Sequence, residues 1–569
     1  MTGFRQVTAV LAFASPIVVY GLYQNGSTVS PCGSPLYCQG DVLKQIELAQ
    51  PFSDSKTFVD LPTKAPLDDV LAAFNKLAQP LSNNTELNSF LSTYFGDAGS
   101  ELAQVPRDQL ETKPIFLDKI DDSVIKQFVQ KVIDIWPDLT RTYYLNRSQP
   151  PLLTQMVKIY VDYTNDTNLV ERALPLLIKE HDFWIKNRTT PIRSGNKTFY
   201  LARYGVQNTE PRPESYREDY ITANNKSYYS SSGIIYPETH ALNESEKAEL
   251  YANLASGAES GWDYNSRWIS TPSDAARDVY FPLRSLNTAN VIGVDLNSIL
   301  YANEITIANY LNATGNHSLA AEFEEMAKNR STAMYSLMWN DKYMSYFDYN
   351  LTSESQNIYV PSDSDTTPAQ EADSPQGYQV FFHIAQFYPF WLGAAPAQLR
   401  DNPLAVKLVF QRVSDLLSEK AGAVAATNYM TGQQWDQPNV WPPLQYILMK
   451  GLIETPATFG QDDPSYIAIQ DLSLKLAQRY LDSTFYADNS TNVAGGGGEY
   501  EVVEGFGWTN GVLIWAVDTF AGKLERPDCG NLTAANTSQQ DMKRYITSRR
   551  AVELPLQDAR RIIKFRKTS

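Results

Sequence analysis

The spacing of apolar residues through the middle of the chain constrains its fold most strongly. Three consecutive stretches carry apolar residues at helical intervals between helix-starting and helix-ending residues. They run from Asn243 to Gly257, from about Asp295 to near Gly315, and onward from His317. Asn243 and Glu246 form a capping box, and Gly257 is expected to end the first helix. A further helical stretch carries Ile469, Leu472, Leu476 and Tyr480. Because alternating strand patterns are few, the sequence predicts an all-α domain.

Composition narrows the class of partner. With 43% hydrophobic and 20% charged residues, the chain has the composition of an ordinary globular protein. Its formal net charge of -16 argues against a nucleic-acid partner, because such binding depends on neutralising phosphates. We find no HExxH or CxxC arrangement and no GxSxG elbow, so we expect no metal, no cofactor and no serine triad. An uncharged small molecule is the expected substrate, and no obligatory protein partner is inferred.

The amino terminus has the pattern of a secretory signal. Arg5 precedes an apolar run, interrupted by Pro16, that is shorter than the roughly 20 residues that span a bilayer, so removal is favoured over a membrane anchor. More than a dozen Asn-x-Ser/Thr sequons also favour the secretory pathway. Cys32 and Cys38 could close a small loop in an oxidising compartment. We therefore expect a glycoprotein that is secreted or lies on the extracellular face.

Three segments combine carboxylates, tryptophans and glycines in a way that suits sugars. They are residues 259–268, 433–443 and 495–511. Aromatic rings stack on the apolar faces of sugars, while carboxylates, Arg, Asn and Gln bond to the hydroxyls. Asp263 lies between Trp262 and Tyr264, and these aromatic neighbours are expected to raise its pKa toward that of a general acid. Each segment alone is more often a core aromatic or a flexible loop, but their joint occurrence favours a site.

The same segments resemble the signatures of the trehalase family. QQWDQPNVWPP at 433–443 resembles QWDxPxxWxP, and residues 259–268 resemble the ESGWDxSSRW block. GGGGEY with the following GFGWTNG, RSQPP at 147–151 and RPESY at 212–216 also match. The resemblance extends from Cys32 to about Gly522 and implies an (α/α)6 barrel, a toroid of six helical hairpins that hydrolyses α,α-trehalose to two glucose molecules with inversion. On this basis the chain divides into a signal peptide at 1–24, a catalytic domain at 25–528 and a peripheral tail at 529–569.

The resemblance also implies roles for individual residues. Asp263 would be the general acid. The substrate would be bound by Arg147, Ser148, Gln149, Arg212, Pro213, Glu214, Gly261 and Glu499. Among these, Arg147, Gln149, Arg212, Glu214 and Glu499 would bind the sugar hydroxyls. The wall of the pocket would be built by Trp262, Trp435, Asp436 and Trp441.

Two stretches that the family uses are missing from this sequence. Between Arg141 and Thr142 the family carries several dozen residues with the signature PGGRFxExYxWDxY, and before Gly495 it carries an EKYD-like motif whose glutamate is the general base. We assign no base, because Asp482 lies too early and Glu499 belongs to a different family position. Loss of the first stretch would remove more than one helix, so the toroid is expected to be incomplete. Each lost helix exposes the apolar faces of its neighbours, which costs about 25 cal/mol per Å² of surface uncovered.

Three functions are compatible with these features. The leading hypothesis is a trehalase whose activity is impaired by the missing stretches. A second is a non-catalytic secreted protein that binds trehalose or another sugar. A third is a helical repeat scaffold, which does not explain the tryptophan-rich loops.

Overall fold

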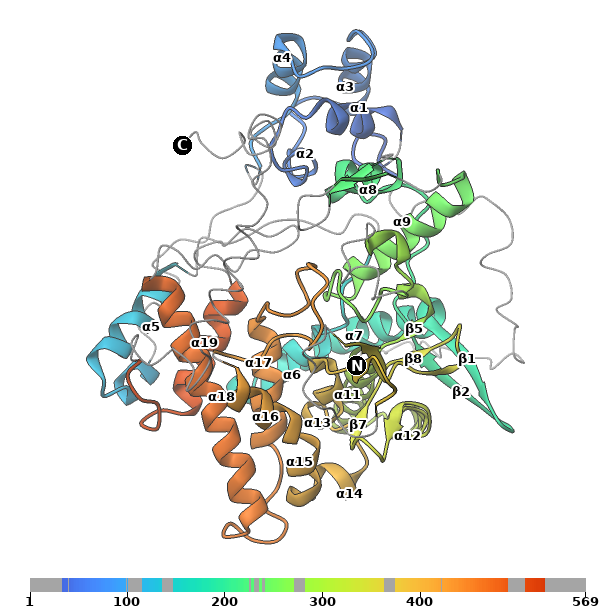
Figure 1. Cartoon of the computed structure of the whole chain (residues 1–569). Helices are drawn as coiled ribbons and strands as arrows, with labels where there is room; N and C mark the ends of the chain where they lie inside the picture. The colour runs from blue at the N-terminus through green and yellow to red at the C-terminus, as the bar shows by residue number, and fades with distance from the viewer. Residues whose placement is uncertain are drawn as a thin grey trace, which may run out of the picture.

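The computed structural model describes most of the chain between residues 33 and 527 (Figure 1). The described residues are 33–38, 40–98, 100, 115–135, 147–224, 227–229, 235–237, 241–270, 282–362, 374–420, 422–489 and 507–527. The predicted signal peptide, Cys32 and the tail at 529–569 lie outside them. Among the described helices, none is long and apolar enough to cross a membrane.

The helices predicted from the sequence are present in the structure. They are α9 at Glu244–Glu259, α11 at Val294–Ala313, α12 at His317–Met338 and α18 at Pro464–Asn489. The Asn243 side chain accepts hydrogen bonds from the first turn of α9, and Glu246 completes the capping box. Gly257 does not end α9, so that expectation was wrong. A Cβ at residue 257 would lie 2.9 Å from the Asp263 carbonyl oxygen, so the glycine serves close packing inside the helix.

A run of helices forms the inner layer of the fold. Its order is α6 at Leu153–Thr164, α11, α13 at Tyr388–Trp391, α17 at Pro442–Ile453 and α19 at Gly507–Thr519, each packed on the next. Helix α11 is buried around most of its circumference, as expected for an inner position. On the outside, α7 at Thr167–Arg188 packs on α6, α12 on α11, and α18 on α17. The prediction of an all-α toroid built from helical hairpins is confirmed.

Exposed apolar side chains gather on helices α6 and α7 among the described residues. Eight of the seventeen exposed large apolar side chains of the described residues lie on or next to α6 and α7. On α6, Met156 is 64% and Tyr163 is 76% exposed, and Ile159 and Tyr160 lie on the same stretch of helix. Apolar residues at this spacing normally face a neighbouring helix. Helix α6 follows the junction at residues 141 and 142 in the sequence, so the exposed residues lie next to the point where the first stretch is expected to be missing.

The remaining helices are short or lie at the periphery. They are α1 at Asp41–Ala49, α2 at Lys56–Val59, α3 at Leu67–Phe74, α4 at Thr85–Tyr94, α5 at Ser123–Ile135, α8 at Tyr216–Asn224, α14 at Ala397–Arg400, α15 at Pro403–Val409 and α16 at Gln411–Glu419. Single 3-10 turns occur at Ile115–Lys119, Pro213–Ser215, Pro282–Ser285, Thr288–Asn290 and Ile384–Phe387.

The strands are short and antiparallel. They are β1 at Thr189–Ser194, β2 at Lys197–Ala202, β3 at Ser227–Tyr229, β4 at Ile235–Pro237, β5 at Val291–Ile292, β6 at Trp339–Asn340, β7 at Ser345–Tyr346, β8 at Tyr349–Asn350, β9 at Ser355–Gln356, β10 at Tyr359–Pro361 and β11 at Tyr378–Val380. The hairpin of β1 and β2 pairs Thr189 with Ala202 and Ser194 with Lys197. It projects from the helices in Figure 1.

A separate small core joins α1 to α4 near the amino terminus. Its buried members include Phe58 and Phe90, and Tyr216 of α8 packs into the same cluster. Two further contacts fix this unit to α8. The hydroxyl of Ser55 donates to Glu218 at 2.7 Å, and the Arg217 guanidinium donates to the backbone oxygens of Phe52 and Ser53. The amino-terminal helices therefore support the segment that carries Arg212 and Glu214.

Candidate functional site

The loop after α9 presents Asp263 in a restrained backbone conformation. Gly261 has φ of 67° and Asp263 has φ of 37°, so the chain reverses tightly here. Aspartate tolerates this left-handed region better than most residues. A Cβ on residue 261 would lie 3.2 Å from the Pro150 side chain. Gly261 therefore lets the predicted acid loop approach the Arg147–Pro151 segment.

The Asp263 carboxylate meets the second predicted segment. The indole Nε1 of Trp435 donates a hydrogen bond to Asp263 Oδ2 over 3.1 Å. Asp263 is half-buried, while Trp435 and Trp262 are buried. Two segments that are 172 residues apart in the sequence are thus joined at the predicted acid.

Four tryptophans form one wall around this contact. Trp435 and Trp441 stack with ring centroids 4.2 Å apart, and the edge of Trp508 packs on both. Trp262 lies 5.3 Å from Trp435 between ring centroids. Trp508 belongs to the GFGWTNG motif, but the sequence analysis assigned it no role. Flat aromatic faces of this kind suit the apolar faces of sugar rings.

Asp436 does not line this wall; it is fully buried behind it. Its carboxylate accepts hydrogen bonds from the backbone N–H and the hydroxyl of Ser266, and from the hydroxyls of Thr427 and Thr431. Burial raises the pKa of Asp436 to about 6, although these hydrogen bonds act in the opposite direction. Asp436 thus ties the tryptophan segment to the Asp263 loop.

We expect Asp436→Asn to change the pH dependence of stability. The folded pKa of about 6 exceeds the ordinary value of 3.8, so the folded state binds the proton more tightly than the unfolded state. Its contribution to the free energy of unfolding therefore falls as pH rises from about 4 to about 6, by an amount on the order of 3 kcal/mol at most. Urea unfolding at several pH values checks this: the wild type should lose stability relative to the variant across that window. Parallel pH profiles would contradict it, and Asp415→Asn on exposed α16 is the control.

Arg147, Arg212 and Glu214 form a buried charged cluster. Arg147 Nε donates to Glu214 Oε1 over 2.9 Å, and the Arg212 guanidinium makes a bidentate pair with Asp219 at 2.7 and 2.9 Å. Burial alone would raise the pKa of Glu214, but Arg147 and Arg212 outweigh it and hold that pKa below its usual range. Glu214 Oε2 has no hydrogen-bond partner among the described residues. An ionised carboxylate with a free oxygen beside two arginines can accept a ligand hydroxyl.

The arginine cluster is coupled to the Asp263 loop. The Arg147 guanidinium donates to the Ala258 carbonyl over 3.2 Å, and the amide of Gln149 donates to the same oxygen over 3.4 Å. The Arg212 guanidinium lies 5.4 Å from the centre of the Tyr264 ring. These contacts bring predicted sugar-binding residues to the end of α9 that carries the acid.

Ser148 and Pro213 hold backbone positions near this cluster. The Ser148 N–H donates to Glu259 Oε1 over 3.2 Å, and Arg188 pairs with both oxygens of Glu259 at 2.7 and 2.9 Å. Pro213 is buried and starts the turn that contains Glu214. Sequence reasoning gave no role to Arg188 or Glu259, because their partners are far apart in the chain.

Arg267 supports the far side of the acid loop. It is fully buried and pairs with Asp295 at 3.0 Å and with Asp348 at 2.8 Å. The guanidinium also lies between the rings of Trp262 and Trp268, 4.6 and 4.3 Å from their centres. A cation held between two carboxylates and two rings restrains the loop on which Asp263 lies. This cluster was also missed by sequence reasoning.

Two further amides are buried without hydrogen-bond partners among the described residues. Both polar atoms of the Asn208 and Gln434 side chains lack partners, and each side chain is about 1% exposed. Buried polar groups normally find partners, so such amides are candidates to bind water or ligand. Gln434 precedes Trp435, and Asn208 precedes the Arg212 segment.

Not every predicted site residue falls within the described chain. Glu499, the glycine run and the region just before it lie outside, as does the junction at 141 and 142. Asp482 is on the outer helix α18, where its carboxylate accepts from Gln478, whose amide also donates to the Glu525 carbonyl. No cluster of possible metal ligands occurs among the described residues.

A toroid of helical hairpins with a half-buried aspartate, a tryptophan wall and an arginine cluster at one end defines the class of helical glycosidases. The family model "Trehalase" matches residues 50–142 and 137–521. The chain belongs to the trehalase family. The two matches overlap at 137–142, the junction at which the first of the two stretches is expected to be missing.

Named relatives agree with this assignment. The chain is 28% identical to "Trehalase" of Apis mellifera over 612 residues, covering 92% of this chain and 90% of that protein. It is 30% identical to "Trehalase" of Dictyostelium discoideum over 606 residues, covering 89% and 93%. Each alignment is longer than this 569-residue chain, so the relatives carry residues that it lacks. The solved structure of neutral trehalase Nth1 from Saccharomyces cerevisiae has 21% identity, covers 69% of this chain and 66% of its own, and gives a TM-score of 0.44.

Proposed function

We propose that this chain binds α,α-trehalose between the tryptophan wall and the arginine cluster and hydrolyses it slowly. The observation that carries the proposal is the hydrogen bond from Trp435 to Asp263 over 3.1 Å, because a carboxylate in contact with an aromatic wall supports the acid role. The trehalases of Apis mellifera and Dictyostelium discoideum align with this chain over 90% and 93% of their own lengths, which supports the proposal.

The charged groups suit the acid role of this reaction and the binding of the sugar. Hydrolysis with inversion needs one carboxylic acid to protonate the leaving oxygen and one carboxylate to activate water. Asp263 is the acid in this proposal. Arg147, Arg212 and the free oxygen of Glu214 would orient the sugar hydroxyls, and burial excludes competing water.

Turnover is expected to be low because the glutamate that serves as general base in the family is missing. Loss of a general base typically lowers the rate by roughly 10² to 10⁴. The same absence supports the alternative, a protein that binds trehalose without hydrolysing it. Arginine, glutamate and tryptophan side chains that recognise hydroxyls and ring faces would serve either function.

Glucose release and trehalose binding distinguish these functions. With purified full-length protein, we expect measurable trehalose binding by calorimetry and slow glucose release in a coupled assay, with no response to maltose. Trehalose binding without glucose release would support the alternative, a protein that binds the sugar without hydrolysing it. Neither binding nor release from folded protein would contradict both.

We also infer that the chain is exported. Cys38 is disulfide-bonded, and its partner lies outside the described residues. Disulfides persist mainly in oxidising compartments, which supports the signal peptide and the sequons. Expression in a eukaryotic host should give a secreted protein whose mass falls on deglycosylation. Retention inside the cell at unchanged mass would contradict this.

A further inference from the structure

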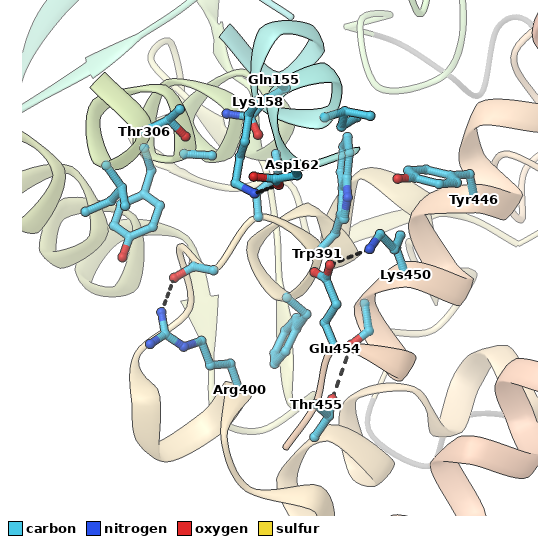
Figure 2. A pocket seen from close by; sticks show the side chains of 18 of the residues that line it. Gln155, Lys158, Asp162, Thr306, Trp391, Arg400, Tyr446, Lys450, Glu454 and Thr455 are labelled. Carbon is cyan, nitrogen blue, oxygen red and sulfur yellow. Dashed lines mark hydrogen bonds and ion pairs between the residues drawn. The ribbon is translucent and has the colours of Figure 1, made fainter. Parts of the chain in front are cut away.

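A hollow lies in the same helical toroid, and Asp263 is not among the residues that line it. Its volume is about 480 Å³, and it is bounded by α6, α11, α13, α17 and α19 (Figure 2). It shares no residue with the predicted sugar site. On α17, Lys450 follows Trp441 by nine residues, which at a rise of 1.5 Å per residue is about 14 Å along the helix. A volume within the roughly 300–1,000 Å³ of ligand pockets can hold a small sugar.

Aromatic rings form one wall of this hollow. Tyr446 packs edge-on against Trp391 and Trp515, with centroid distances of 5.8 and 4.6 Å. All three rings line the hollow and are partly exposed, so some of their apolar surface faces its interior. The Tyr446 hydroxyl has no hydrogen-bond partner among the described residues, which leaves it able to donate to a ligand. The aromatic lining is completed by Tyr163 of α6, Tyr301 of α11 and Phe390 of α13.

The charges that line the hollow are balanced and paired. Lys158 bonds to Asp162 over 2.5 Å, Lys450 to Glu454 over 2.6 Å, and Arg400 to Asp401 over 3.0 Å. Figure 2 shows the first two pairs on different elements around Trp391. Three cations thus meet three anions, so neither a phosphate nor a metal cation finds a net opposite charge. Ion pairs in partly exposed positions keep spare donors and acceptors for hydroxyl groups.

Exposed side chains of α6 border the opening of the hollow. Ile159 and Tyr163 of α6 line it and are 48% and 76% exposed. In a ring closed at this place, such side chains would be covered by the adjacent helix. The hollow therefore gives a small ligand direct access from solvent.

We propose that this hollow is a second binding site for a neutral mono- or disaccharide, independent of the Asp263 site. The aromatic wall would stack on one face of a sugar ring. The Tyr446 hydroxyl and the paired charges of α6 and α17 would bond to its hydroxyl groups. An anion is disfavoured by the paired carboxylates, and a purely apolar ligand by the polar rim.

Fluorine NMR of protein containing 5-fluorotryptophan can test this site directly. The chain has ten tryptophans, and Trp391→Phe and Trp515→Phe assign the two resonances that report on the hollow. Titration with glucose and with trehalose should shift both resonances saturably. Lys450→Gln should raise the Kd for sugar at least about tenfold. Lys186→Gln is the matched control, because it breaks an exposed i,i+4 ion pair on α7 far from the hollow in the sequence.

The outcomes are separable from the test of the proposed function. Trp435 and Trp441 report on the Asp263 site, so their response can fail while Trp391 and Trp515 still shift. The second site would be overturned if sugar left the Trp391 and Trp515 resonances unmoved, or if Lys450→Gln bound sugar as tightly as the Lys186→Gln control. A shift caused equally by inorganic phosphate would also overturn it, since the hollow would then select anions.

Discussion

Asp263→Asn should abolish the residual release of glucose from trehalose while leaving the protein folded. The substitution keeps the size of the side chain and an oxygen that can accept from the Trp435 indole, but it removes the transferable proton. Loss of a general acid is expected to lower kcat by roughly 10² to 10⁴. Because Asp263 is half-buried and at the surface of the wall, the midpoint of thermal unfolding should change little.

Glucose release and trehalose affinity should be measured on the same preparations. We expect kcat to collapse while the Kd for trehalose stays within a few-fold of wild type. Asp182→Asn, which removes an exposed carboxylate on α7, should retain wild-type turnover. If Asp263→Asn released glucose as fast as this control, Asp263 would not be the acid.

Restoring the two missing stretches should raise activity by about 10² or more. The corresponding segments of the Apis mellifera relative would be inserted between Arg141 and Thr142 and before Gly495. By the resemblance to the family, the second insert would supply the general-base glutamate and the first an arginine of the sugar pocket, so both would lower the transition-state barrier. The first should also cover Met156 and Tyr163 of α6, which are now exposed, and stabilise the fold.

Steady-state kinetics and thermal unfolding measure the two effects separately. A control chain would carry Gly/Ser segments of equal length at both junctions. Higher kcat and a higher unfolding midpoint are expected for the restored chain alone. Equal values for the restored and Gly/Ser chains would mean that these junctions do not explain low activity or the exposed face of α6.

The sequence predicted helices well where local signals agree. The capping box of Asn243 and Glu246 starts α9 as expected, because both partners are within one turn. Gly257 was misjudged, because its packing against Asp263 depends on a loop that returns after the helix. The β1–β2 hairpin was not predicted, since the apolar alternation of Thr189–Ser194 is weak.

The candidate site was predicted in parts. Motifs pointed to Asp263 and Trp435, and the structure joins them. The motif reasoning placed Asp436 in the pocket wall, but its hydrogen bonds to Ser266 are made behind that wall. The Arg267 cluster could not be predicted, because Asp348 is 81 residues away in the chain and only the fold brings it close.

The structure of the Asp263→Asn chain crystallised with trehalose tests the central claim most directly. We expect a glucose ring against Trp435, hydroxyls bonded to Arg147 and Glu214, and the residue 263 side chain about 2.6–3.2 Å from the oxygen that joins the two glucose units. Trehalose bound only elsewhere, or bound with that oxygen far from residue 263, would contradict the proposed role of Asp263.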